Sequence, residues 1–116
     1  MTLKEFAENT QMDFEGTLER FANMESLLVK FLKKFVSDPT YEELRTAIEN
    51  QDFSTVERAA HTLKGVAGNL GFQKLFYINQ EIVDAVRNDN VDKINTLFEE
   101  DKQEYEMIIE NLKMLD

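Results

Sequence analysis

The sequence contains no cysteine and only one histidine, His61, among its 116 residues. The absence of cysteine excludes disulfide bonds, thiolate zinc sites and thiol nucleophiles, and one histidine cannot build a metal site of several imidazoles. No apolar run reaches the roughly 18 residues that a membrane span requires. The first residues also lack the apolar core of a signal peptide, so we expect a cytoplasmic protein.

Glycine and proline are scarce as well, at four residues and one residue. Folds rich in β-strands usually place more of these residues in turns, so their scarcity predicts long helices. Apolar residues make up 42% of the chain and charged residues 31%, a mixture that folds rather than stays disordered. The length fits one domain, and we expect a single unit spanning residues 1–116.

Basic residues are fewer than acidic ones: the chain has 13 lysines and arginines and 23 aspartates and glutamates, so its net charge is -10. Phosphate backbones and anionic lipids repel such a chain, so neither nucleic acid nor a membrane is an expected partner. The acids are unevenly spread: residues 58–80 contain none, and they hold three bases, Arg58, Lys64 and Lys74. This acid-free window surrounds His61 and predicts where an anionic partner docks.

Apolar residues recur at three- and four-residue steps along most of the chain, which is the period of amphipathic helices. Thr2 and Glu5 predict a capping box for a short leading helix, and residues 9–13 predict a loop. The longer helices are expected over residues 16–36 (with a break near 23), 40–48, 54–70, 72–87 and 91–115. We therefore expect an all-α fold, an antiparallel up-and-down four-helix bundle with a short additional N-terminal helix.

Turn and cap residues set the expected boundaries of these helices. Pro39 breaks the chain, and Thr40 is predicted to cap the helix that follows. Ser54 is the predicted N-cap of the next helix, with Glu57 completing a capping box. Gly71 is predicted to end that helix in left-handed geometry.

His61 lies on the open face of the helix expected over residues 54–70, because the apolar residues centre on the opposite side at about 100° per residue. Lys64, Gly65 and Gly68 share its stripe. Glycine within a helix costs about 1 kcal/mol relative to alanine, so two glycines beside an imidazole indicate access for a bulky partner. Lys64 can contact a phosphoryl group attached to that imidazole. If each residue is considered alone, His61 can be an incidental surface histidine and Lys64 a solvated surface lysine.

Two groups of acids have simpler interpretations. Glu57, one turn before His61, can orient the imidazole ring, but a solvated role at the helix start is the favoured interpretation. A cluster of carboxylates on the last helix can attract a hard cation, yet no loop makes them converge, and a solvated acidic face is expected instead. The members of this cluster are Glu99, Glu100, Asp101 and Glu104.

The motif around the histidine is His61-Thr62-Leu63-Lys64-Gly65-Val66-Ala67-Gly68, with Gly71 following it. It resembles the signature of histidine-containing phosphotransfer (HPt) domains, and the likeness extends over about residues 14–115. The resemblance implies a phosphorelay carrier in which His61 takes a phosphoryl group from a receiver-domain aspartate and passes it to another receiver. It also implies that Lys64 contacts the phosphoryl oxygens, that Gly65 and Gly68 leave room for the receiver, and that Gln73 hydrogen-bonds near the imidazole.

The implied partners are response-regulator receiver domains and a hybrid histidine kinase, with Arg58 and Lys74 on the docking surface beside the two glycines. Mg²⁺ is expected on the receiver, and no cofactor is expected on this chain. The sequence has no glycine-rich phosphate loop, so we expect a phosphocarrier and not an ATP-dependent enzyme. A monomer is also expected. Two alternatives stay open: a detached phosphotransfer domain of a chemotaxis-type histidine kinase, and a receiver-docking module without transfer.

Overall fold

The computed structural model describes all 116 residues as helices and their connections, with no strand. The helices are α1 (Leu3–Thr10), α2 (Phe14–Arg20), α3 (Glu25–Phe35), α4 (Thr40–Glu49), α5 (Phe53–Asn69), α6 (Gln73–Arg87), the 3₁₀ turn η1 (Val91–Lys93) and α7 (Ile94–Leu112). The predicted all-α fold is confirmed. None of the helices has the length and apolar character needed to cross a membrane.

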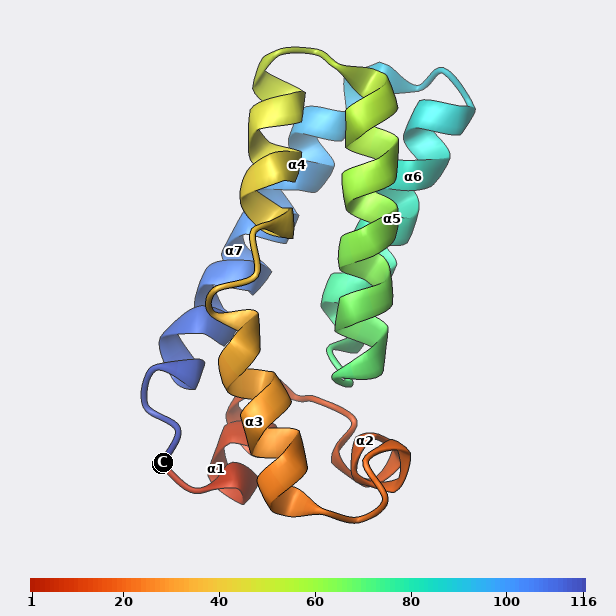
Figure 1. The fold of residues 1–116 in the computed structure, drawn as a ribbon. Helices are drawn as coiled ribbons and strands as arrows, with labels where there is room; N and C mark the ends of the chain where they lie inside the picture. Colours follow the sequence, from red (N-terminus) through yellow and green to blue (C-terminus); the bar gives the residue numbers. More distant parts are fainter.

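Helices α4, α5, α6 and α7 form an up-and-down bundle. Helix α5 packs on both α4 and α6, α6 packs on α7, and α7 closes the bundle against α4. Figure 1 shows α3 continuing below α4, with α1 and α2 closing the lower end of an elongated molecule of 41 × 23 × 19 Å. The predicted bundle is confirmed. Three helices, α1, α2 and α3, precede it, because the helix expected over residues 16–36 is divided into α2 and α3.

The core of the bundle combines aliphatic layers with a chain of aromatic rings. Phe35 on α3 packs against Phe72 and Tyr105, with ring centroids 5.8 and 5.7 Å away. Tyr41 on α4 stacks on Tyr105 at 3.8 Å and on Phe98 at 5.6 Å. These rings join the N-terminal half of the chain to α7, so burial of their apolar area holds α3 and α4 on the bundle.

The N-terminal helices depart from the predicted boundaries for local reasons. Helix α2 begins at Phe14 because Asp13 is its N-cap and accepts from the Gly16 amide at 3.2 Å. The break expected near residue 23 is confirmed, because Ala22 and Asn23 adopt left-handed backbone angles, with φ of 57° and 58°. The capping box of Thr2 and Glu5 is also confirmed.

Three other predicted boundaries were wrong. Ser54 is not the N-cap of α5: Asp52 accepts from the Thr55 amide at 3.3 Å, so the helix begins at Phe53. Thr40 is the first residue of α4, and its own amide donates to Asp38 Oδ1 at 2.8 Å. The last helix is shorter than expected, because the 3₁₀ turn η1 precedes the 19 residues of α7.

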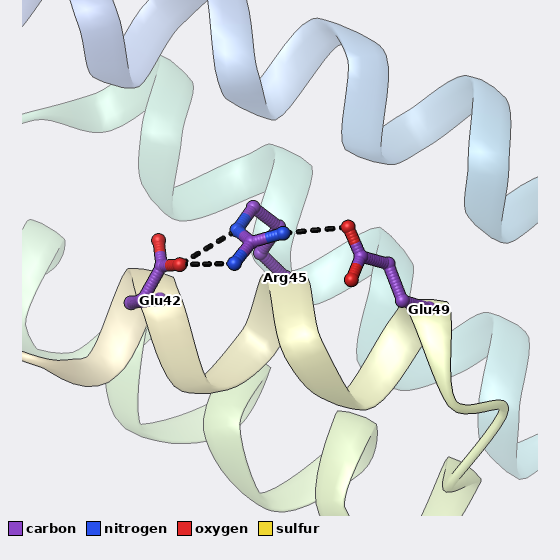
Figure 2. A network of polar contacts seen from close by, with 3 residues as sticks. All are labelled: Glu42, Arg45 and Glu49. Atoms are coloured by element: carbon purple, nitrogen blue, oxygen red, sulfur yellow. Dashed lines mark hydrogen bonds and ion pairs between the residues drawn. The ribbon is translucent and has the colours of Figure 1, made fainter.

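The outer face of α4 carries a small charged network. Arg45 donates through Nε to Glu42 at 2.8 Å and ion-pairs through Nη1 with Glu49 at 2.5 Å, as Figure 2 shows. The three residues have helical i,i+3 and i,i+4 spacing, which brings their side chains to one stripe. Both glutamates are exposed and Arg45 is partly exposed, and such pairs contribute little to stability in water.

Candidate functional site

The exposed imidazole of His61 lies in the middle of α5, on the side turned away from the core. The opposite face of α5 is buried, as the helical wheel predicts. Its buried members are Val56, Ala59, Ala60, Leu63 and Ala67. The packing of these residues fixes the rotation of α5, and that rotation presents His61 to solvent.

The two glycines beside His61 have different surroundings. A Cβ built on Gly65 would meet no atom within 4 Å, so the space above this residue is open. A Cβ on Gly68 would lie 3.0 Å from Cδ2 of Phe76, so the ring of Phe76 already occupies that space. The sequence-based assignment of both glycines to partner access therefore fits Gly65, whereas Gly68 permits the close approach of α6.

Lys64 is half-buried and is held by α6. Its ammonium Nζ donates to Gln80 Oε1 at 2.9 Å and lies 5.8 Å from the ring centroid of Phe76. The amide Nε2 of Gln80 in turn donates to Asp84 Oδ1 at 2.9 Å. A chain of three polar side chains therefore connects α5 to α6, beginning one turn after His61.

The register of α5 against α6 places His61 relative to this chain. Glu57 lies 3.6 Å from Arg87, Lys64 bonds to Gln80, and Gly68 meets Phe76. The three pairs share one antiparallel register, in which His61 lies opposite Val83, with Asp84 the next residue along α6. Val83 is buried and Asp84 is exposed, so Asp84 is the polar side chain of α6 at the level of the imidazole.

Gln73 and Lys74, predicted near the site, lie elsewhere. Gln73 begins α6 and, with Lys74, lines a hollow that α1 and α7 complete through Gln11 and Glu104. His61 is about 12 Å up the axis of α5 from Asn69, since each residue rises 1.5 Å. The structure therefore does not bring Gln73 to the imidazole, and the glutamine that contacts Lys64 is Gln80.

The bases predicted for the docking surface are divided between two faces. Arg58 is exposed on α5, three residues before His61. Lys74 instead lies close enough to Glu104 on α7 to oppose the rise that burial causes in the pKa of that carboxyl. Acids nevertheless border the acid-free window in the folded protein, because Glu57 lies 3.6 Å from Arg87 on α6 and Asp84 accepts from Gln80.

The end of α5 is anchored by α2. Gly71 has a φ of 81°, which confirms the predicted left-handed position, and its carbonyl accepts from the Asp13 amide at 2.9 Å. Arg20 donates through Nη2 to the Gly68 carbonyl at 3.0 Å and to that of Asn69 at 3.3 Å. A cation on the last carbonyls of a helix satisfies groups that lack intrahelical partners. The sequence analysis missed Arg20, because this contact joins residues 48 and 49 positions apart.

One carboxylate of the expected acidic face is inside the protein. Asp101 is fully buried, and its Oδ1 accepts from Nδ2 of Asn79 on α6 at 2.8 Å. Burial raises the pKa of Asp101 from 3.8 to about 7, and the bond from Asn79 opposes that rise. The prediction that Asp101 belongs to a solvated face was therefore wrong. Periodicity alone could have placed Asp101 one turn before Tyr105 and two turns before Ile108, on the inner stripe of α7.

A helical bundle that presents one histidine on its surface, with a lysine one turn later, is the arrangement of a phosphotransfer domain. Two similarities to known proteins support this class. The sequence matches the Hpt domain family over residues 14–114. A similar solved structure is histidine-containing phosphotransfer protein B (HptB) from Pseudomonas aeruginosa PAO1. It has a TM-score of 0.80 and 22% identity, covering 89% of this chain and 91% of that chain. No curated protein matches the sequence.

Because the family match covers most of its length, the chain belongs to the Hpt domain family. Domains of this family are phosphocarrier modules of histidine phosphotransfer and not kinases, and they interact with response-regulator receivers. The family resemblance of the sequence is thereby confirmed. The likeness to HptB shows that the fold is shared.

Proposed function

We propose that this protein is a phosphorelay intermediate that accepts a phosphoryl group on His61 from a receiver-domain aspartate and passes it to a second receiver. The observation that carries the proposal is the exposed imidazole of His61, with open space above Gly65 and a lysine ammonium one turn away. The first receiver belongs to a hybrid histidine kinase, and the second to a response regulator. The chain acts as a monomer in both transfers.

The transfer is a displacement at phosphorus. The unprotonated nitrogen of the neutral imidazole attacks the acyl phosphate in line, the N–P bond forms, and the bond from phosphorus to the aspartate oxygen breaks. The aspartate leaves as a carboxylate with that electron pair. The same step in reverse loads the second receiver. The transition state is loose and anionic, so cations around the transferring group lower its energy.

The chain supplies one of these cations. The ammonium of Lys64 has three N–H donors, and Gln80 takes only one of them, so two are free for phosphoryl oxygens. We assign the Mg²⁺ of the reaction to the receiver, where it would neutralise the acyl phosphate. Exposure of His61 serves the reaction because the receiver must bring its aspartyl phosphate against the imidazole.

The test is a transfer profile against the receiver domains of the source genome. Each receiver is phosphorylated with a small-molecule donor and mixed with the wild-type chain or with His61→Gln. We expect acid-labile label on the wild-type chain from at least one receiver and none on His61→Gln. The absence of label from every receiver would refute the relay. Label obtained only from the ATP domain of a kinase would favour the detached kinase domain, and binding without label would favour the docking module.

A further inference from the structure

The polar chain of Lys64, Gln80 and Asp84 has one possible direction. The ammonium of Lys64 can only donate, and an ionised Asp84 carboxylate can only accept. The amide of Gln80 must therefore turn its oxygen to Lys64 and its nitrogen to Asp84. The two hydrogen bonds, each 2.9 Å long, have this arrangement. The reversed amide would direct two donors at each other at one end and two acceptors at the other. Charges at both ends thus lock the orientation of Gln80.

We propose that Gln80 is a positioning residue for phosphotransfer, which holds the Lys64 ammonium beside His61 while Asp84 fixes the Gln80 amide. This inference rests on the proposed function. Gln80 touches neither the imidazole nor the phosphoryl group in this scheme, and it acts through Lys64. The register of the two helices supports the assignment, because it places Gln80 beside Lys64, one turn along α5 from His61.

Holding Lys64 in advance matters because a lysine side chain is long and flexible. A free ammonium must be ordered when the phosphoryl group arrives, whereas a held one is already in place, and preorganised charge is the more effective catalyst. A neutral amide suits this task. It accepts one hydrogen bond and leaves the charge of Lys64 available, whereas a carboxylate at position 80 would neutralise that charge.

The test uses phosphoramidate, a donor that needs no partner protein. Its phosphoryl group moves to the imidazole as its P–N bond breaks and ammonia leaves. The labelling rate is followed by intact mass for the wild-type chain, Lys64→Ala, Gln80→Ala and the double variant. The matched control is Gln103→Ala, an exposed glutamine on α7. Thermal unfolding of each variant checks that the fold is intact.

We expect Gln80→Ala to slow labelling roughly threefold to tenfold, and the double variant to be no slower than Lys64→Ala, because coupled residues are not additive. Gln80→Glu should label more slowly than Gln80→Ala, which a purely structural role for Gln80 would not produce. Rates for Gln80→Ala equal to wild type, or factors that multiply in the double variant, would overturn this inference alone. A wild-type chain that takes no label would instead count against the proposed function.

A second, independent observation concerns the buried pair of Asn79 and Asp101. Both Nδ2 hydrogens of Asn79 are used, on Asp101 Oδ1 at 2.8 Å and on the Leu75 carbonyl at 2.9 Å. Two buried oxygens have no partner: Oδ1 of Asn79 and Oδ2 of Asp101. An unpaired buried oxygen costs stability, and a buried carboxylate costs more. Asp101 takes part in none of the ion pairs of the chain.

We infer that Asp101 is a neutral carboxylic acid in the folded protein and that its Oδ2–H donates to Oδ1 of Asn79. One proton then satisfies both unpaired oxygens, and the two side chains form a closed acid–amide pair. The titratable neighbour on α4 is Tyr41, whose pKa is raised mainly by burial. A phenol is either neutral or anionic, so Tyr41 provides no cation that would keep Asp101 ionised.

The sign of the resulting pH dependence is fixed. In the unfolded chain Asp101 loses its proton near pH 3.8, whereas in the folded protein it keeps the proton up to about pH 7. The folded state therefore binds the extra proton between these values, and its stability falls as pH rises through this window. At lower and at higher pH, Asp101 does not make the free energy of unfolding depend on pH.

The test compares wild type with Asp101→Asn, whose amide imitates the protonated acid. Urea unfolding between pH 4 and 8 should show wild type losing stability relative to Asp101→Asn as pH rises to about 7. Carbon NMR of the Asp101 carboxyl gives the second readout and should show titration well above the ordinary value. An ordinary titration, or parallel stability curves for the two proteins, would overturn the inference.

Discussion

At the scale of single residues, the site depends on what surrounds each side chain more than on the motif itself. Two glycines on one helix stripe look equivalent in the sequence, yet open solvent lies above Gly65 and an aromatic ring lies above Gly68. Lys64 looks like a free surface lysine, yet a hydrogen bond from a second helix holds it. The motif could be recognised from its own residues, whereas these neighbours come from α6 and depend on how α6 is aligned with α5.

Replacing Gly65 and Gly68 by alanine should change the free energy of unfolding by different amounts. Gly65→Ala should raise the free energy of unfolding by about 0.5–1 kcal/mol, because alanine is the better helix former and its Cβ meets no atom. Gly68→Ala should gain less, because the ring of Phe76, 3.0 Å from the new Cβ, must move. Urea unfolding measures both changes. A larger gain for Gly68→Ala would contradict the packing described here.

Gly65→Ala also separates helix stability from partner access. Its new methyl group projects into the open space beside His61, where a receiver would approach. Transfer from a phosphorylated receiver should therefore slow by a larger factor than labelling by the much smaller phosphoramidate. Equal factors for the two donors would mean that the receiver does not approach over Gly65.

At the scale of elements, the antiparallel pairing of α5 and α6 builds the site, and the turn at Gly71 sets its register. The sequence allowed the helix, the turn and the glycine to be predicted, because periodicity and left-handed preference are local signals. The partners Gln80 and Asp84 could have been found by counting outward from that turn. Asp52 as the N-cap of α5 was harder to predict, because Ser54 is an equally good capping residue in the sequence.

Gly71 should therefore be the least replaceable glycine. Gly71→Ala forces alanine into a φ of 81°, and its Cβ would lie 2.1 Å from Oγ1 of Thr17 and 3.0 Å from the Asp13 carbonyl oxygen. The left-handed backbone alone costs about 1–3 kcal/mol, and displacement of α2 adds to that. Urea unfolding should show a loss of this size or more, with Gly65→Ala as the control. A change within about 0.5 kcal/mol of wild type would show that α2 does not pack tightly on this turn.

At the scale of the whole molecule, the net charge of -10 describes the surface of the bundle poorly. Glu57 and Asp84 border the stretch of sequence without acids, and one of its three bases, Lys74, lies near Glu104 on α7. One acid, Asp101, is inside the bundle. Composition predicted the all-α fold class, but only packing decides which charges lie on which face and which lie in the core.

The central claim is that the chain carries a phosphoryl group between two proteins on His61. The most direct measurement purifies the phosphorylated chain, mixes it with an unphosphorylated receiver, and follows the label on both proteins over time. The claim predicts that label leaves His61 and appears on the receiver aspartate, and that Lys64→Ala slows this step. Label that stays on the chain with every receiver, or that maps to a residue other than His61, would contradict it.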